Sequence, residues 1–181
     1  MEVENLLVKV AKILQNLDIP YLITGGIAVT VWGRPRATFD IDIVVELKEP
    51  KISSLVKSLK ALSKAGYINE EAAKTALKEK GEFNFIHPQT GLKVDFWVVK
   101  NTIFSTGEFK RKIAKKIRGE KIYFISPEDL ILEKLLWHKD SSSSRQLEDI
   151  KSILKISKVD LKYIKKWAKE QSTSDIFNKL I

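Results

Sequence analysis

The stretch YLITGGIAVTVWGRPRATFDIDIVVEL, residues 21–47, decides how this chain folds. Its opening YLIT, residues 21–24, is short and apolar, which predicts a buried strand that the pair Gly25–Gly26 ends. The next run, IAVTVW at 27–32, has two interpretations. Its β-branched residues favour a strand, whereas its place directly after two glycines also fits a short helix. Pro35 then favours a loop over residues 34–38.

The segment FDIDIVVEL, residues 39–47, alternates and then becomes wholly apolar, as a central strand does. Asp40 and Asp42 are two residues apart, so their side chains share one face, with Cα atoms about 6.5–7 Å apart. Carboxylates held on one side of a rigid strand can bind divalent cations. The simpler alternative is that both carboxylates lie on the solvent-exposed face of a half-buried strand and bind nothing.

A third acid lies in GLKVDFWVVK, residues 91–100, which we expect to pair as an antiparallel hairpin with EFNFIH, residues 82–87. Asp95 is surrounded there by apolar residues. Burying an ionised carboxylate is costly unless it is paired or bound to metal. Asp95 is therefore a candidate metal ligand, and the alternative is an edge strand with one wet face.

The glycine pair offers a second element of the same site. Without Cβ atoms, the backbone at Gly25 and Gly26 can approach a phosphate closely, and the N–H groups of the next turn can bind its oxygens. A simple tight turn is the alternative. The pair matches neither a P-loop nor a dinucleotide fingerprint.

Composition limits the chemistry. The 181 residues, 44% of them hydrophobic, suffice for a real core. The absence of cysteine excludes disulfides, thiolate zinc sites and a cysteine nucleophile, and two histidines are too few for a histidine-rich metal site. Carboxylates are left as metal ligands, which favours a hard cation such as Mg²⁺ or Mn²⁺.

The net charge of +9 suits polyanionic partners such as nucleic acid, although lysine-rich helices also give basic chains. No signal peptide and no bilayer-spanning segment is visible, so we expect a cytoplasmic protein without membrane contact.

The rest of the chain divides into an α/β part, residues 1–126, and a helical part, residues 127–181. Ser126, Pro127 and Asp129 form the start of a helix, with a cap, a proline and an acid in the first turn. Periodicity predicts helices over 3–17, 51–65, 69–80, 145–155 and 158–170, and a strand over 121–126.

The glycine pair and the acids together resemble the motif of the nucleotidyltransferase superfamily, the DNA polymerase beta-like proteins. That motif places an acid–apolar–acid strand 9 to 13 residues after the glycines, and here residues 27–39 separate Gly26 from Asp40. Asp95 matches the family's third acid. Gly33, Arg36 and Thr38, with the later SPEDLILEKLLWHKD and RQLEDI, resemble the branch of AbiEii-type toxin nucleotidyltransferases and related uncharacterised proteins.

The resemblance implies a small mixed sheet flanked by helices, of α/β (α+β) class. It implies that Gly25 and Gly26 hold the triphosphate and that Asp40 and Asp42 bind two Mg²⁺ ions. Asp95 would complete one metal site and help to deprotonate an acceptor hydroxyl.

Other side chains have a functional and a plain interpretation. Arg36 is a candidate phosphate ligand or a solvated loop arginine. Thr38 orients a metal ligand or the loop, or reflects β propensity alone. We expect Lys134 at the surface and all four tryptophans in the core.

The sequence thus predicts a metal-dependent enzyme that moves an NMP from an NTP to a hydroxyl. The acceptor would be an RNA 3′ end such as that of tRNA, a protein or a small molecule. The branch resemblance suggests a toxin with an antitoxin partner. The alternative is a non-catalytic module with the same fold that binds nucleotide or nucleic acid.

Overall fold

A computed structural model gives the fold and describes residues 2–63 and 65–181. The chain forms two compact units. The sheet unit comprises the chain up to Ile27 together with Ala37–Phe124, and the helical unit comprises Ala28–Arg36 with Ile125–Ile181.

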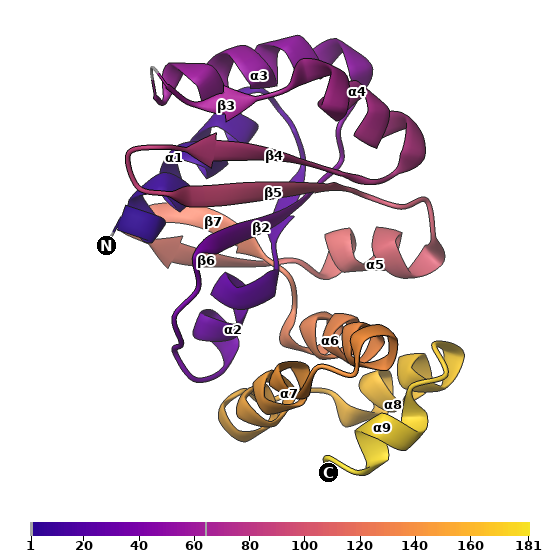
Figure 1. The fold of residues 1–181 in the computed structure, drawn as a ribbon. Coiled ribbons are helices and arrows are strands. Elements are labelled where there is room, and N and C mark those ends of the chain that lie inside the picture. The colour runs from indigo at the N-terminus through magenta and orange to yellow at the C-terminus, as the bar shows by residue number, and fades with distance from the viewer. Residues whose placement is uncertain (1, 64) are drawn as a thin grey trace. The chain divides into compact units, whose positions relative to one another are not determined.

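The sheet unit contains, in chain order, α1 (Glu2–Asn16), β1 (Tyr21–Ile23), β2 (Asp40–Val45), a 3₁₀ turn (Glu49–Lys51), α3 (Ile52–Ala61), β3 (Tyr67–Ile68), α4 (Glu70–Glu79), β4 (Glu82–His87), β5 (Leu92–Val98), α5 (Ile103–Arg111), β6 (Ile113–Ile117) and β7 (Glu120–Phe124). Its strands form one sheet in the order β3-β4-β5-β2-β1-β7-β6 (Figure 1). β2 runs parallel to β5 and β1 to β7, and the other neighbours are antiparallel. The mixed α/β class predicted from the sequence is confirmed.

The two faces of this sheet differ in polarity. Ile41 and Ile43 of β2 are fully buried, as are Val94 and Phe96 of β5. Their burial indicates that this is the face of the sheet that α1, α3 and α4 cover, and Figure 1 shows the arrangement of these helices. Asp40 and Asp42 alternate with these isoleucines and are only partly covered. The opposite face therefore carries the polar side chains, as period-two alternation predicts.

The segment that the sequence left open, residues 27–32, is helical. It belongs to α2 (Gly25–Trp32), which begins in the sheet unit and ends in the helical unit. The predicted strands at 21–24 and 39–47 and the β4–β5 hairpin are confirmed. The strand β6 was not predicted, because its sequence IAKKI lacks a continuous apolar face. It is held as an edge strand by its pairing with β7. The strand β3 and helix α5 were also not predicted.

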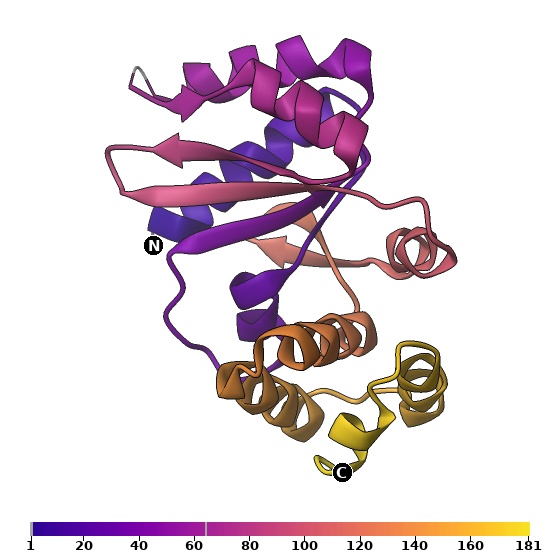
Figure 2. The same cartoon turned by 45° about the vertical axis from the view of Figure 1, so that its right-hand side comes forward.

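The helical unit contains α6 (Pro127–Ser141), α7 (Ser144–Ile156), α8 (Leu161–Glu170) and α9 (Ser174–Asn178) (Figure 2). The predicted helix start is confirmed, because Ser126 Oγ accepts the Asp129 N–H at 3.1 Å. Residues 28–36 are fastened to this unit through Trp32, whose Nε1 donates to the carbonyl of Ile125 at 2.9 Å and whose carbonyl accepts from Ser157. Across the described residues, every helix is too short or too polar to cross a bilayer.

Candidate functional site

The three acids lie on two neighbouring strands in the middle of the sheet. Asp42 and Asp95 are direct partners across the parallel pair β2 and β5, and Asp40 is the partner of Lys93. Partners in a ladder point to the same side, with the strands about 4.8 Å apart. The fold therefore brings Asp40, Asp42 and Asp95 onto one face, although 52 residues lie between Asp42 and Asp95 in the sequence.

Each acid has a polar neighbour. Thr38 Oγ1 donates to Asp40 Oδ1 at 2.6 Å, and Trp97 Nε1 makes a long contact of 3.5 Å with Asp42 Oδ1. Asp95, only 7% exposed, forms an ion pair with Lys93 whose Nζ–Oδ2 distance is 2.9 Å. The hydrogen bond that Lys93 donates to Asp95 raises the pKa of Lys93 above its usual range. The burial of Asp95 is thus offset by a lysine on its own strand.

The glycine pair meets the acids at the start of α2. Gly25 has φ +62°, the left-handed region that favours glycine. A Cβ there would overlap the Asp42 carboxylate and lie 2.8 Å from the Asp42 Cβ. The backbone adds a hydrogen bond of 3.0 Å from Thr24 N–H to the Asp42 carbonyl. Gly25 is therefore required by its contact with Asp42, a reason that the sequence did not reveal. Gly26 is buried in the first turn of the helix.

The donor chemistry of this face suits a hard divalent cation. Carboxylate oxygens from two strands converge on one side, and magnesium and manganese prefer such ligands. Within residues 2–63 and 65–181, however, no three acid or histidine side chains stand close enough together to enclose a metal ion. Binding of a metal ion by all three acids would therefore require a rotation of these side chains and the release of Lys93 from Asp95.

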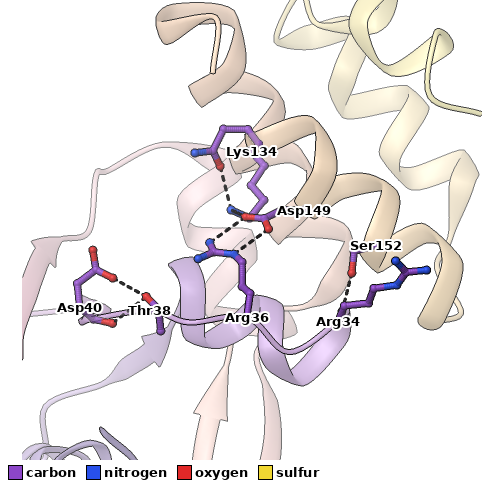
Figure 3. Close-up of polar contacts among 8 residues, drawn as sticks. Arg34, Arg36, Thr38, Asp40, Lys134, Asp149 and Ser152 are labelled. Carbon is purple, nitrogen blue, oxygen red and sulfur yellow. Dashed lines mark hydrogen bonds and ion pairs between the residues drawn. The ribbon is translucent and has the colours of Figure 1, made fainter. Parts of the chain in front are cut away.

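Arg36 lies in the helical unit and bonds to a side chain there. Its Nε and Nη2 donate to the two oxygens of Asp149 at 2.9 and 3.0 Å (Figure 3). Lys134 Nζ lies 2.7 Å from Asp149 Oδ2 and donates to Gln146 at 2.9 Å. The expectation of a surface lysine is wrong, because Lys134 is 2% exposed. Its role is to share, with Arg36, the charge of a buried carboxylate.

Burial and pairing oppose each other in this network. Burial lowers the pKa of Lys134, and the ion pair with Asp149 only partly offsets that shift. For Asp149 burial raises the pKa, but the hydrogen bonds from Arg36 and Lys134 outweigh it and leave the pKa below its usual range. Beside the network a cavity of about 400 Å³ is lined by Arg34, Pro35, Arg36, Glu148, Asp149, Lys151, Ser152 and Lys155.

Two tryptophans contradict the expectation of core packing. Trp97 is 41% exposed and Trp137 52% exposed, whereas Trp32 is buried as expected. Trp97 has the same parity as Asp95 on β5, so it shares the polar face, and this parity was readable in the sequence. Asn84, the partner of Asp95 on β4, is an exposed residue of the same row that sequence reasoning missed.

Family comparison decides the class of the protein. The model of a family described as "Nucleotidyltransferase of unknown function (DUF6036)" matches residues 1–180. The chain belongs to this family. The superfamily inferred from the glycine pair and the acids is confirmed, while the AbiEii-type branch stays a prediction. No protein sequence with curated annotation matches this nucleotidyltransferase significantly.

Solved structures share the fold at low sequence identity. ANT(2")-Ia in complex with adenylyl-2"-tobramycin has a TM-score of 0.65 at 13% identity, over 96% of this chain and 98% of that one. The lincosamide antibiotic adenylyltransferase LnuA, lincomycin-bound, has a TM-score of 0.58 at 16% identity, over 87% and 98%. An antigenic nucleotidyltransferase-like protein from Paracoccidioides brasiliensis has a TM-score of 0.54 at 20% identity, over 86% and 75%.

Proposed function

We propose that this nucleotidyltransferase moves an NMP from an NTP to a hydroxyl acceptor, with Mg²⁺ or Mn²⁺ held by Asp40, Asp42 and Asp95. One observation carries the proposal: these three acids share a sheet face, and the glycine that opens α2 is packed against Asp42. Acidic residues that only formed the solvent-exposed face of a strand would not require a glycine at the start of the neighbouring helix. A phosphate site at a helix start next to metal ligands accounts for both features.

The backbone of Gly25 and Gly26 would hold the triphosphate, because the first N–H groups of a helix have no partner within the helix. When bound, the metal ions neutralise the triphosphate and polarise its α-phosphorus. Asp95 would take the proton of the acceptor hydroxyl. A bond then forms from that oxygen to the α-phosphorus, the bond to the bridging oxygen breaks, and pyrophosphate leaves.

Thr38 would orient Asp40 through its 2.6 Å hydrogen bond, the first of the two roles expected for it. Arg36 stays a candidate phosphate ligand, although its guanidinium already donates to Asp149. A phosphate would share the guanidinium with Asp149 or enter the adjoining cavity, whose lining includes Arg34, Lys151 and Lys155. Trp97 offers an exposed ring, on the same face as the acids, to a nucleobase or to a ring of the acceptor.

The names of two structural neighbours suggest small hydroxylated acceptors, since one holds an adenylylated tobramycin and the other is a lincosamide adenylyltransferase. The net charge of +9 supports an anionic acceptor instead, and we favour an RNA 3′ end such as that of tRNA over a protein hydroxyl. A cytoplasmic toxin controlled by an antitoxin is the biological setting that the motif resemblance suggests.

The experiment is transfer of label from each of four α-³²P-labelled NTPs to total RNA, to a protein extract and to a panel of aminoglycosides and lincosamides, with Mg²⁺ present. We expect one class of acceptor to become labelled by the wild type, and none by Asp42→Asn. Equal labelling by the two proteins would contradict the assignment. Binding of NTP without any transfer would favour a non-catalytic binding module.

A further inference from the structure

The charge of this protein is concentrated at one edge of the sheet. Residues 110–121, KRKIAKKIRGEK, carry seven basic side chains and one acid, a net charge of +6 out of +9 for the whole chain. They comprise the end of α5, all of β6, the turn and the first two residues of β7. Glu120, the one acid, is already paired with Lys12 of α1 at 2.8 Å. The segment is therefore strongly basic, with a single acidic residue among its twelve.

Three of these lysines form a cluster on one face of the hairpin. Lys116 on β6 is the direct cross-strand partner of Lys121 on β7, and Ala114 is the partner of Tyr123. Lys112 Nζ lies 4.7 Å from the centre of the Tyr123 ring, and Lys121 Nζ lies 5.3 Å from it. We call Lys112, Lys116 and Lys121 the lysine cluster.

The pairing of Lys116 with Lys121 is unfavourable in the protein alone, because like charges directly opposite each other across two strands destabilise the pair. Lysine on an edge strand does discourage pairing with other chains. To prevent such pairing, positive charge is needed only on the edge strand β6. Lys121, however, lies on the inner strand β7. Glu120 cannot offset the cluster from the same face, since it alternates with Lys121 and bonds to α1. A polyanion bound outside the hairpin would offset it.

The lysine cluster lies on the same side of the sheet as the acids. Ile23 of β1 is the partner of Ile43 on β2 and of Phe124 on β7, and all three are buried on the helix-covered side. Tyr123 and Lys121 alternate with Phe124 as Asp42 alternates with Ile43, so they face the other way. Strands about 4.8 Å apart put β7 about 10 Å and β6 about 15 Å from β2 across the sheet.

We propose that the β6–β7 hairpin binds the phosphodiester backbone of a single-stranded nucleic acid, whose 3′-terminal hydroxyl reaches the acids on β2 and β5. This proposal rests on the proposed function, for which it assigns the surface that binds the acceptor. A polyanion with regularly spaced phosphates fits a row of lysines at one edge and a catalytic centre farther along the same face. A small cationic acceptor would be repelled by the same hairpin.

The test is equilibrium binding of a fluorescein-labelled 15-nucleotide RNA, and of the DNA of equal sequence, at a series of salt concentrations. The test variant is K112Q/K116Q/K121Q. The matched control is K9Q/K57Q/K78Q, which removes the same charge from exposed positions of α1, α3 and α4 in the same unit. We expect the test variant to bind RNA at least tenfold more weakly at about 50 mM salt, with the slope of log K against log salt reduced by about 2. The control should bind within twofold of the wild type.

Three outcomes would overturn the proposal: equal losses in the two variants, wild-type affinity in the test variant, or no RNA or DNA binding by the wild type. Tight binding of the wild type to phosphatidylserine vesicles with no binding to the oligonucleotides would assign the hairpin to a membrane instead. A preference for RNA over DNA would identify the 2′-hydroxyl as part of recognition. Mg²⁺-dependent binding of NTP is measured on the same variants. The absence of this binding would contradict the proposed function, whereas a loss of RNA binding alone would not.

Discussion

Gly25 and Asp42 occupy neighbouring space so closely that no other residue fits at position 25. The backbone at Gly25 is left-handed, and a Cβ would overlap the Asp42 carboxylate. The two residues are 17 positions apart, on β1–α2 and on β2, and the Thr24–Asp42 backbone hydrogen bond fixes their approach. The glycine pair and the acid pair are therefore one structural unit rather than two neighbouring motifs.

Replacement of Gly25 by alanine should damage both stability and activity. The left-handed backbone alone costs an alanine about 1–2 kcal/mol, and displacement of Asp42 adds to this. Gly91→Ala is the matched control, because Gly91 has φ +67° but a Cβ there would meet nothing within 4 Å. Urea unfolding should give Gly25→Ala the larger loss of free energy of unfolding, and only Gly25→Ala should lose nucleotidyl transfer. Equal losses of stability in the two variants would show that Asp42 does not constrain position 25.

The buried carboxylate of Asp149 should be a large contributor to stability. Asp149→Leu leaves Lys134 and Arg36 facing a site without an anion, and breaking a buried pair in this way costs about 3–5 kcal/mol. The double variant Lys134→Met/Asp149→Leu leaves only Arg36, which is partly exposed, so it should lose less than the two single variants summed. Additive losses in urea unfolding would mean that the two side chains do not stabilise each other.

The same carboxylate should make stability depend on acidity. The pKa of Asp149 is lower in the folded protein than in the unfolded chain, because Arg36 and Lys134 outweigh the effect of burial. Its contribution is therefore complete above the unfolded pKa, near 4, and is lost as pH falls through the folded pKa. The difference in free energy of unfolding between wild type and Asp149→Asn should narrow below about pH 4. A difference that stays constant from pH 6 to pH 2.5 would contradict this assignment.

Trp97 should affect binding of substrates more than folding. It is 41% exposed on the face of the acids, and loss of one base-stacking contact costs about 1–3 kcal/mol. Trp97→Ala should raise KM for the NTP or for the acceptor about tenfold and change the free energy of unfolding little. Trp32→Ala is the contrast, since Trp32 is buried and its removal should cost about 3–5 kcal/mol of stability. A Trp97→Ala protein with unchanged KM values would leave the ring without a role in binding.

The sequence was sufficient where one local pattern determines the structure. The alternation in FDIDIVVEL placed Asp40 and Asp42 on one face of a strand, and Ser126 with Asp129 located the start of α6. It was insufficient where a distant partner decides. Lys134 looks like a surface lysine on an ordinary helix until Asp149 and Gln146 of α7 are brought beside it. Residues 27–32 have β-branched composition, yet they continue the helix that Gly25 begins.

The charged hairpin shows another limit of sequence reasoning. IAKKI has no apolar face, so periodicity does not mark it as a strand, and only the pairing of Lys116 with Lys121 shows how its charges are arranged. For Trp97 the sequence did contain the relevant pattern, because Trp97 lies two residues after Asp95 and so shares its face of the strand. The apolar residues around Trp97 led instead to the expectation of a core residue.

We expect Asp40, Asp42 and Asp95 to bind a metal–nucleotide complex. Titration calorimetry with a non-hydrolysable NTP analogue, in Mg²⁺ and in EDTA, tests it most directly on wild type, Asp42→Asn and the exposed-acid control Asp140→Asn. We predict binding to wild type and control only in Mg²⁺, and affinity at least 100-fold lower for Asp42→Asn, a loss of about 2.7 kcal/mol. If the analogue binds the wild type equally tightly in EDTA, or binds Asp42→Asn as tightly as the wild type, these acids do not hold a metal–nucleotide complex.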